Sequence, residues 1–203
     1  MGKEIELKYS VPCAEDIEII QKSELVLKNL SGEFLTIEMH ATYYDTDDSL
    51  LSKKGISLRK RMENGVSVYT VKTSISKGGA LASRGEWQVN ADSIPSALSL
   101  LRENADIPEY LFEICKNHRL CPCAETVFTR KTAPLAFGAE LCLDAGYLSG
   151  VEFYELEIEL TTCSALELID FGTRLSEEFS LQPQPKSKLH RAREYYFKQK
   201  GIE

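Results

Sequence analysis

Apolar and polar side chains alternate with a period of two along much of the chain. In residues 2–10, for example, Ile5, Leu7 and Tyr9 alternate with charged residues at positions 4, 6 and 8. This period is typical of β-strands, whose successive side chains point to opposite faces. It predicts eight strands, at residues 2–10, 34–45, 56–63, 66–74, 83–91, 124–132, 138–147 and 151–161. Between two of them, Asn64-Gly65 predicts a two-residue hairpin turn.

Helices are predicted between and after these strands. Pro12 opens one that extends to about Leu27, and a short helical turn covers residues 50–54 before Gly55. Ser93 and Ser164 are good N-cap residues for helices at 94–103 and 164–179, and another helix is expected at 108–116. Residues 182–185 (QPQP) predict a stiff linker, and residues 186–200 a basic C-terminal helix.

These elements predict an α+β fold in a single domain, residues 1–203. Eight antiparallel strands avoid exposed sheet edges best when the sheet closes into a β-barrel. The helices would then pack outside the barrel, against the apolar face of each strand.

The polar faces of the strands are unusually rich in charge. For a single strand, a polar face most often meets solvent. Here the helices are expected to cover the apolar faces, so the charged faces would point into the barrel. Burying so many charges is costly unless they pair or bind ligands. The pattern therefore favours a ligand-binding tunnel over a purely structural barrel.

The signs of these charges indicate a ligand. Guanidinium and ammonium groups suit phosphate oxygens, and the cationic positions are Lys8, Arg59, Arg61, Lys72, Arg84 and Arg130. Clustered carboxylates suit Mg²⁺ or Mn²⁺, and the acidic positions are Glu4, Glu6, Asp144, Glu155 and Glu157. Together they predict a site for a metal–polyphosphate complex. Gly78-Gly79 lacks the surrounding residues of a P-loop.

The amino-acid composition limits the classes of binding partner that are expected. The chain has 203 residues, with 24 Lys and Arg against 31 Asp and Glu, a formal net charge of −7. This excess of acid argues against nucleic acid as the main partner. No apolar run is long enough to span a membrane, and the amino terminus has no apolar signal segment. A cytoplasmic enzyme without membrane partners is expected.

Six cysteines raise the question of zinc. Cys115, His118, Cys121 and Cys123 lie close in sequence, but their spacing matches no common zinc motif. Ordinary reduced cysteines near a helix end are the favoured interpretation.

Several short motifs, in order along nearly the whole chain, resemble the CYTH domain or triphosphate tunnel metalloenzyme superfamily. Its E-x-E-x-K signature resembles Glu4-x-Glu6-x-Lys8. The further matching motifs are Tyr43-Tyr44-Asp45-Thr46, Leu58-Arg59-Lys60-Arg61, Thr70-Val71-Lys72, Arg84-Gly85-Glu86, Phe128-Thr129-Arg130, Leu143-Asp144-Ala145-Gly146, Glu155-Leu156-Glu157 and Ser187-Lys188.

The resemblance implies an eight-stranded tunnel that holds two divalent ions, Mg²⁺ or Mn²⁺, and assigns roles to residues. Metal ligands would be Glu4, Glu6, Asp144, Glu155 and Glu157, with Glu159 supporting them. Phosphates would be bound by Lys8, Arg59, Arg61, Lys72, Arg84, Arg130 and Lys188, and Arg191 is a further candidate. The residues expected to act in catalysis are Glu4, Glu6, Lys8 and Lys72.

The favoured function is a metal-dependent hydrolase that cleaves the terminal phosphate of inorganic triphosphate. Within the superfamily, a class IV adenylate cyclase and a thiamine triphosphatase are alternatives. Trp87, the only tryptophan, is expected to point away from the tunnel, which disfavours stacking on an organic group. A polyphosphate- or nucleotide-binding module without catalysis is a further alternative, and the chain as a homodimer is one option for assembly.

Overall fold

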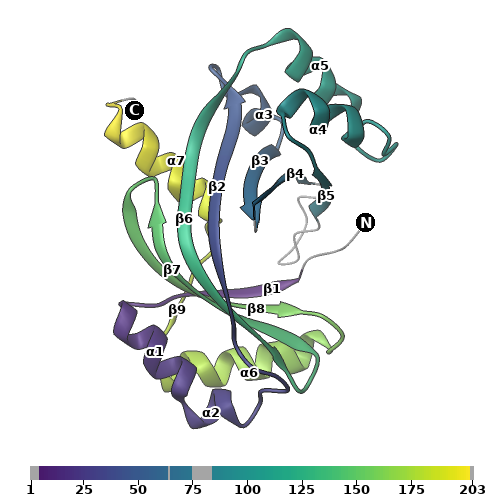
Figure 1. Cartoon of the computed structure of the whole chain (residues 1–203). Coiled ribbons are helices and arrows are strands. Elements are labelled where there is room, and N and C mark those ends of the chain that lie inside the picture. Colours follow the sequence, from purple (N-terminus) through teal and green to yellow (C-terminus); the bar gives the residue numbers. More distant parts are fainter. Residues whose placement is uncertain (1–4, 64, 75–83, 202–203) are drawn as a thin grey trace. The chain divides into compact units, whose positions relative to one another are not determined.

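The computed structural model describes residues 5–63, 65–74 and 84–201, and Figure 1 shows its elements. Its strands are hydrogen-bonded in the order β5-β4-β3-β2-β6-β7-β8-β1-β9. The chain divides into two compact units. The first comprises the described residues of Met39–Thr126 and Ala192–Glu203, and the second those of Glu4–Glu38 and Val127–Arg191. Strands β2 (Leu35–Thr46) and β6 (Leu120–Leu135) and helix α7 (Lys188–Gln199) contribute residues to both.

Three antiparallel strands form the centre of the first unit. They are β3 (Ile56–Glu63), β4 (Val66–Ser74) and β5 (Arg84–Asn90). The register pairs Arg59 with Thr70 and Lys72 with Glu86. Gly65, in the turn after β3, has a φ of 83°, a conformation that glycine adopts without strain. Asn64, the other half of the predicted turn, lies outside the described residues.

The apolar face of these strands is covered by helices α3 (Leu50–Lys53), α4 (Ile94–Leu101) and α5 (Glu109–Asn117), as Figure 1 shows. Leu58, Val71 and Trp87 pack there against Leu101 and Leu111. Burying a large apolar side chain contributes about 1.5–3 kcal/mol. This burial determines which way each strand faces, so Arg59, Lys72 and Glu86 emerge on the opposite face. Trp87 is buried among the helices, as the sequence predicts.

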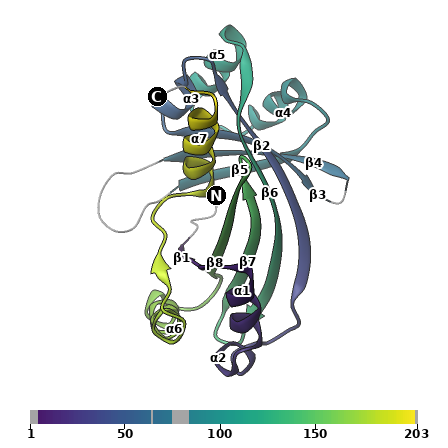
Figure 2. The same cartoon turned by 90° about the vertical axis from the view of Figure 1, so that its left-hand side faces the viewer.

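The second unit is built on β7 (Ala139–Leu148), β8 (Val151–Leu160) and β1 (Glu6–Ser10), which lie side by side in Figures 1 and 2. The antiparallel register pairs Lys8 with Glu157, and Asp144 with Glu155. Charged residues of three neighbouring strands are therefore placed on one face.

Helices α1 (Ala14–Lys22), α2 (Glu24–Leu27) and α6 (Ala165–Glu178) cover the other face of these strands. The core contains Leu143, Leu156 and Ile158 from the strands, with Phe171 and Leu175 from α6. A Cβ atom added at Gly172 of α6 would lie 2.5 Å from Leu7 Cδ1 and 2.8 Å from Tyr9 Oη. The absent side chain thus lets α6 approach β1 closely.

The α+β architecture of antiparallel strands and covering helices confirms the predicted fold class. The described strands form one nine-stranded sheet that runs from β5 to β9, rather than the predicted closed ring of eight. One boundary differs at the first helix, which the sequence predicts as a single element to about Leu27. The structure has two helices, divided at Ser23. The Ser23 N–H donates to Ile20 O at 3.1 Å and ends α1, while its side-chain oxygen accepts from Val26 N at 3.2 Å and caps α2.

Two further predictions are corrected. Strand β6 starts at Leu120 rather than at 124, so Cys121 and Cys123 lie within a strand. The predicted linker contains a short strand, β9 (Gln182–Pro183), which pairs with β1. Gln184 strengthens this attachment, because its N–H donates to Lys8 O at 2.9 Å and its side chain to Ser10 Oγ at 2.9 Å. In the part of the chain that the structure describes, no helix is both long and apolar enough to cross a membrane.

Candidate metal and phosphate site

Three buried carboxylates converge in the second unit. Asp144 of β7 and Glu155 and Glu157 of β8 offer oxygen atoms that all lie within 4.8 Å of one another. Asp144 and Glu155 are 0% exposed and Glu157 is 5% exposed. Glu155 and Glu157 share a face because they are two positions apart in one strand. Clustered oxygen donors of this kind fit a hard divalent cation.

A second carboxylate group shares Glu157. It joins this residue to Glu6 of β1 and Glu159 of β8, again with oxygen atoms within 4.8 Å of one another. The register places Glu6 opposite Glu159. The two groups together supply donors for more than one cation, and Glu157 is the residue common to both.

Lys8 lies between these groups. Its Nζ is 2.9 Å from Glu6 Oε1 and 3.3 Å from Glu157 Oε1. Burial alone lowers the pKa of an ammonium group, but the negative charges of Glu157 and Glu6 outweigh it, so the pKa of Lys8 is raised. Lys8 therefore stays charged and balances the carboxylates.

Arg130 of β6 crosses the same cluster. Its Nε donates to Asp144 Oδ1 and its Nη2 to Asp144 Oδ2, each at 2.8 Å. Nη2 also donates to Glu157, and Nη1 lies 3.4 Å from Glu159 Oε1. The planar guanidinium thus ties together carboxylates from β7 and β8, which a lysine could not do with the same geometry.

Two cations enter from the first turn of α7. Lys188 Nζ lies 2.9 Å from Asp144 Oδ2 and 2.7 Å from Glu157 Oε1, and it also donates to Glu155 Oε1. Arg191 is three residues further along the same turn, and its Nη2 donates to Glu155 Oε2. The Arg191 guanidinium lies over the Phe153 ring, 5.5 Å from its centroid.

The electrostatic environment separates the two glutamates of β8. Burial raises the pKa of Glu157, but Lys188, Lys8 and Arg130 together outweigh it and hold that pKa well below its usual range. For Glu155, burial dominates and the neighbouring Glu157 adds to it, so its pKa is raised despite Lys188 and Arg191. Glu157 is thus the more strongly ionised of the pair.

The first unit presents a second set of polar groups. Arg59 Nη2 donates to Thr70 Oγ1 at 3.2 Å, and Lys72 Nζ lies 3.0 Å from Glu86 Oε2. Burial raises the pKa of Glu86, but Lys72 and the other partners outweigh it and lower that pKa. Arg61 follows on the same face of β3 as Arg59. Glu86 was not among the predicted site residues, although the alternation of β5 places it on the charged face.

The predicted site residues therefore fall into two groups. Those that the structure brings together in the second unit are Glu6, Lys8, Arg130, Asp144, Glu155, Glu157 and Lys188, with Arg191 in direct contact. Those of the first unit are Arg59, Arg61 and Lys72. For Arg84 the structure describes only the backbone in β5, and Glu4 lies outside the described residues.

Cysteines play no part in either carboxylate group. All six are free thiols, and the ligand groups found among the described residues contain only Asp and Glu. Burial raises the pKa of Cys115 and that of Cys123 to about 11. These thiols therefore stay protonated near neutral pH.

A separate buried ion pair lies in the first unit. Asp45 of β2 is 2% exposed and accepts from Leu51 N at 2.9 Å, from Ser52 Oγ at 2.7 Å and from Arg193 Nη1 at 2.6 Å. These donors outweigh the effect of burial and lower the pKa of Asp45. The carboxylate thereby joins the N-terminus of α3 to helix α7.

The sequence matches a known protein family over nearly its whole length. The family model of the CYTH domain matches residues 2–192 and so covers parts of both units. The chain belongs to the CYTH family. An inorganic triphosphatase of Haemophilus influenzae is 29% identical over 199 residues. That match covers 94% of this chain and 54% of the relative, so the chain spans about half the length of the curated protein.

Solved structures show the same fold. HpAC1 of Hippeastrum, a proposed adenylyl cyclase with a dominant triphosphatase activity, is 18% identical. It has a TM-score of 0.70, with 98% of this chain and 97% of that one covered. A proposed adenylate cyclase of Bacillus halodurans is 22% identical, with a TM-score of 0.57 over 92% and 96% of the two chains. At these identities the likeness establishes the fold.

Proposed function

We propose that this CYTH protein is a divalent-metal-dependent triphosphatase that cleaves the terminal phosphate of inorganic triphosphate. The observation that carries the proposal is the convergence of the Asp144, Glu155 and Glu157 carboxylates within 4.8 Å, in contact with cations from three other elements. A metal–polyphosphate complex requires carboxylates that bind the metal and, beside them, cationic side chains that bind the phosphate oxygens. The similarity to an inorganic triphosphatase supports the same reaction.

The donor set fits the metal. Asp144, Glu155, Glu157 and Glu6 would hold Mg²⁺ or Mn²⁺, because carboxylate oxygens are the preferred ligands of both ions. The two carboxylate groups sharing Glu157 are consistent with two ions. When bound, the ions supply charge neutralisation at the phosphate oxygens and a water of lowered pKa for hydrolysis.

The chain's own cations bind and orient the substrate. Lys8, Arg130 and Lys188 are held near the carboxylates and would contact the phosphate that is transferred. Their charges would also stabilise the negative charge that develops on the leaving pyrophosphate. The sequence predicts that Arg59, Arg61, Lys72 and Arg84 bind the same anion. Arg59 suits this role because its Nη2 donates to a neutral hydroxyl, Thr70 Oγ1, which a phosphate oxygen readily replaces.

Inorganic triphosphate is favoured over substrates with an organic group. Trp87 is buried against helices α4 and α5, so it cannot stack on a thiazole or a base. The charged groups described above recognise phosphate and metal, and they do not distinguish one base from another. The cyclase reaction therefore stands as a competing outcome of the same experiment.

The deciding experiment measures products from inorganic triphosphate, ATP and thiamine triphosphate, each with Mg²⁺, Mn²⁺ or EDTA. We expect rapid release of phosphate and pyrophosphate from inorganic triphosphate with metal, and no release with EDTA. Cyclic AMP from ATP would assign the protein to the cyclase reaction. Tight binding of triphosphate with no turnover of any substrate would instead identify a binding module.

A further inference from the structure

The Lys188 ammonium lies among the three buried carboxylates, in the position that a metal ion would take. Its ammonium contacts all three members of the buried group, with 2.9 Å to Asp144 Oδ2, 2.7 Å to Glu157 Oε1 and a further hydrogen bond to Glu155. These are the same oxygen atoms whose convergence suits a metal. An ammonium and a divalent ion cannot both be surrounded by them at once.

Arg191 also contacts the buried carboxylates, through Glu155. Lys188 binds Oε1 of Glu155 and Arg191 binds Oε2, so the first turn of α7 engages both oxygens of this carboxylate. Glu155 is 0% exposed, so both of its oxygens face cations of α7 and neither faces solvent. A metal that uses Glu155 must therefore compete with α7.

Charge balance leads to the same conclusion. The cluster contains the carboxylates of Glu6, Asp144, Glu155, Glu157 and Glu159, and the cations Lys8, Arg130, Lys188 and Arg191. It is already close to neutral, so a divalent ion would give it an excess of positive charge. Triphosphate removes this excess, because its oxygens offer the α7 cations a new partner.

The four cationic side chains differ in how readily they can move away from the carboxylates. Lys8 and Arg130 belong to strands β1 and β6, whose backbones are fixed by the hydrogen bonds of the sheet. Lys188 and Arg191 belong to a helix that starts after the chain has left β9. A small displacement of this first turn releases both cations without breaking the sheet.

We infer that the first turn of α7 supplies a cation that exchanges with the metal. The Lys188 ammonium and the divalent metal are alternative partners of Asp144, Glu155 and Glu157. Triphosphate draws Lys188 and Arg191 away and so opens the carboxylates to the metal. Metal and triphosphate then bind with positive coupling, which by linkage acts equally in both directions. This inference rests on the proposed function, since it requires that these carboxylates bind metal.

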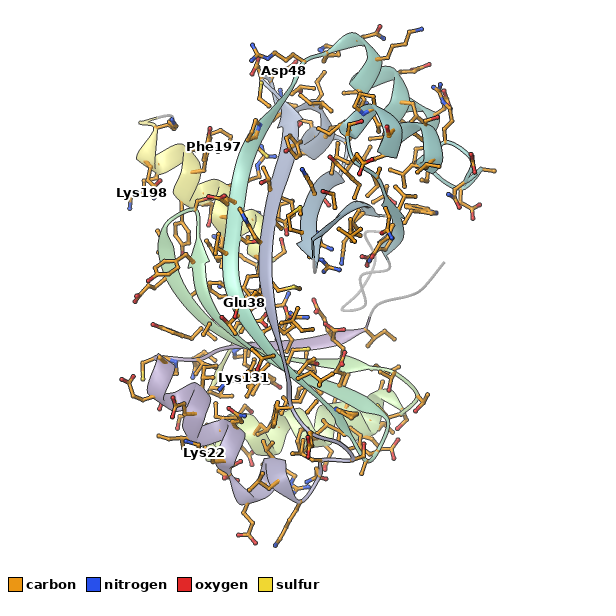
Figure 3. The ribbon with its side chains drawn as sticks, viewed as in Figure 1. Lys22, Glu38, Asp48, Lys131, Phe197 and Lys198 are labelled. Carbon is orange, nitrogen blue, oxygen red and sulfur yellow. The ribbon has the colours of Figure 1, made fainter. Side chains whose placement is uncertain are left out.

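The test measures Mn²⁺ binding without triphosphate, by electron paramagnetic resonance of free Mn²⁺ and by calorimetry. Lys188→Gln is expected to bind Mn²⁺ about tenfold more tightly than the wild type, within the roughly 5- to 150-fold range of such couplings. Lys188→Arg keeps the charge and is expected to bind Mn²⁺ as weakly as the wild type. Lys198→Gln is the matched control, because it removes the same charge from the exposed outer end of the same helix (Figure 3).

A second measurement guards against misfolding. Circular dichroism checks each variant, and Mn²⁺ is expected to raise the melting temperature of Lys188→Gln more than that of the wild type, because tighter binding gives greater stabilisation. Equal or weaker Mn²⁺ binding by folded Lys188→Gln overturns the inference and leaves the metal site intact. Absence of Mn²⁺ binding in both proteins overturns the inference together with the metal-dependent function.

Discussion

Arg130 and Asp144 form two parallel hydrogen bonds, from Nε and Nη2 to the two carboxylate oxygens, each 2.8 Å long. Asp144 is 0% exposed, so it has no access to water that could replace this partner. The pair joins β6 to β7 on the charged face of the second unit. Its geometry makes Arg130 a structural residue as well as a candidate ligand of phosphate.

Replacing Arg130 is therefore expected to destabilise the protein. Breaking a buried ion pair by removing one partner costs roughly 3–5 kcal/mol, because the other charge remains buried. Urea unfolding of Arg130→Ala should show that the free energy of unfolding falls by an amount near the lower end of this range, because Lys188 still contacts Asp144. Arg174→Ala, which removes an exposed pair with Asp170 on α6, should cost less than about 0.5 kcal/mol. A loss under about 1 kcal/mol in Arg130→Ala would contradict this role.

Glu157 is expected to be indispensable for turnover. It is common to both carboxylate groups, so Glu157→Gln weakens both proposed metal positions while it preserves the shape of the side chain. Metal-dependent release of phosphate should fall by about a hundred- to a thousandfold, comparable with the loss of one key electrostatic group. Glu152→Gln changes an exposed residue of the same strand and should leave the rate unchanged. Substantial activity in Glu157→Gln would place the metal elsewhere.

Arg59 is expected to act on substrate affinity. Arg59→Ala removes a guanidinium that the sequence predicts to bind phosphate, and we expect the KM for triphosphate to rise about tenfold or more, as loss of one charge-assisted contact of about 1.5–3 kcal/mol implies. Steady-state kinetics at saturating metal measure this change. Lys60→Ala is the matched control, because Lys60 is adjacent in β3 and faces the other side of the strand. If both variants raise KM equally, the effect is one of overall charge.

Asp45 is expected to give a pH-dependent contribution to stability. Its folded pKa lies below its ordinary value of 3.8, so the ionised carboxylate stabilises the fold above about pH 4. This contribution is lost as the pH falls through the lower, folded pKa. Asp45→Asn should therefore lower the free energy of unfolding by about 2 kcal/mol at pH 7, the scale of a charged hydrogen bond.

Urea unfolding at pH 7, 4 and 3 measures this dependence. The difference between Asp45→Asn and the wild type should shrink towards pH 3, whereas the exposed Asp106→Asn should differ little from the wild type at every pH. A difference that stays constant with pH would show that the charge of Asp45 does not contribute.

The sequence predicts the faces of the strands well and the partners of single side chains poorly. Alternation alone places Asp144, Glu155 and Glu157 on the charged face, because the helices must cover Leu143, Leu156 and Ile158. The direct contact of Arg191 with Glu155 is harder to predict. Its only signal is the spacing of three residues from Lys188, which puts both on one side of a helix.

Local boundaries depend on competing hydrogen bonds that composition does not reveal. Ser23 follows an apolar pattern that continues to Leu27, yet its side chain caps a new helix instead of extending the old one. Residues 182–185 have the prolines of a linker, but Gln182 and Pro183 pair with β1. The prediction failed there because the strand edge that accepts them is supplied by a segment more than 170 residues earlier, with Gln184 and Ser10 separated by 174 positions.

Gly172 is a buried residue of α6 that packs against the apolar side of β1, behind the charged face. It touches Leu7 and Tyr9, and the residue between them, Lys8, points to the opposite side of the same strand. A single methyl group on α6 would press against the middle of β1, behind a cation that contacts Glu157. Tolerance to mutation near the site is thus set partly by a residue that no substrate reaches, and a search for inactivating changes confined to charged residues would overlook it.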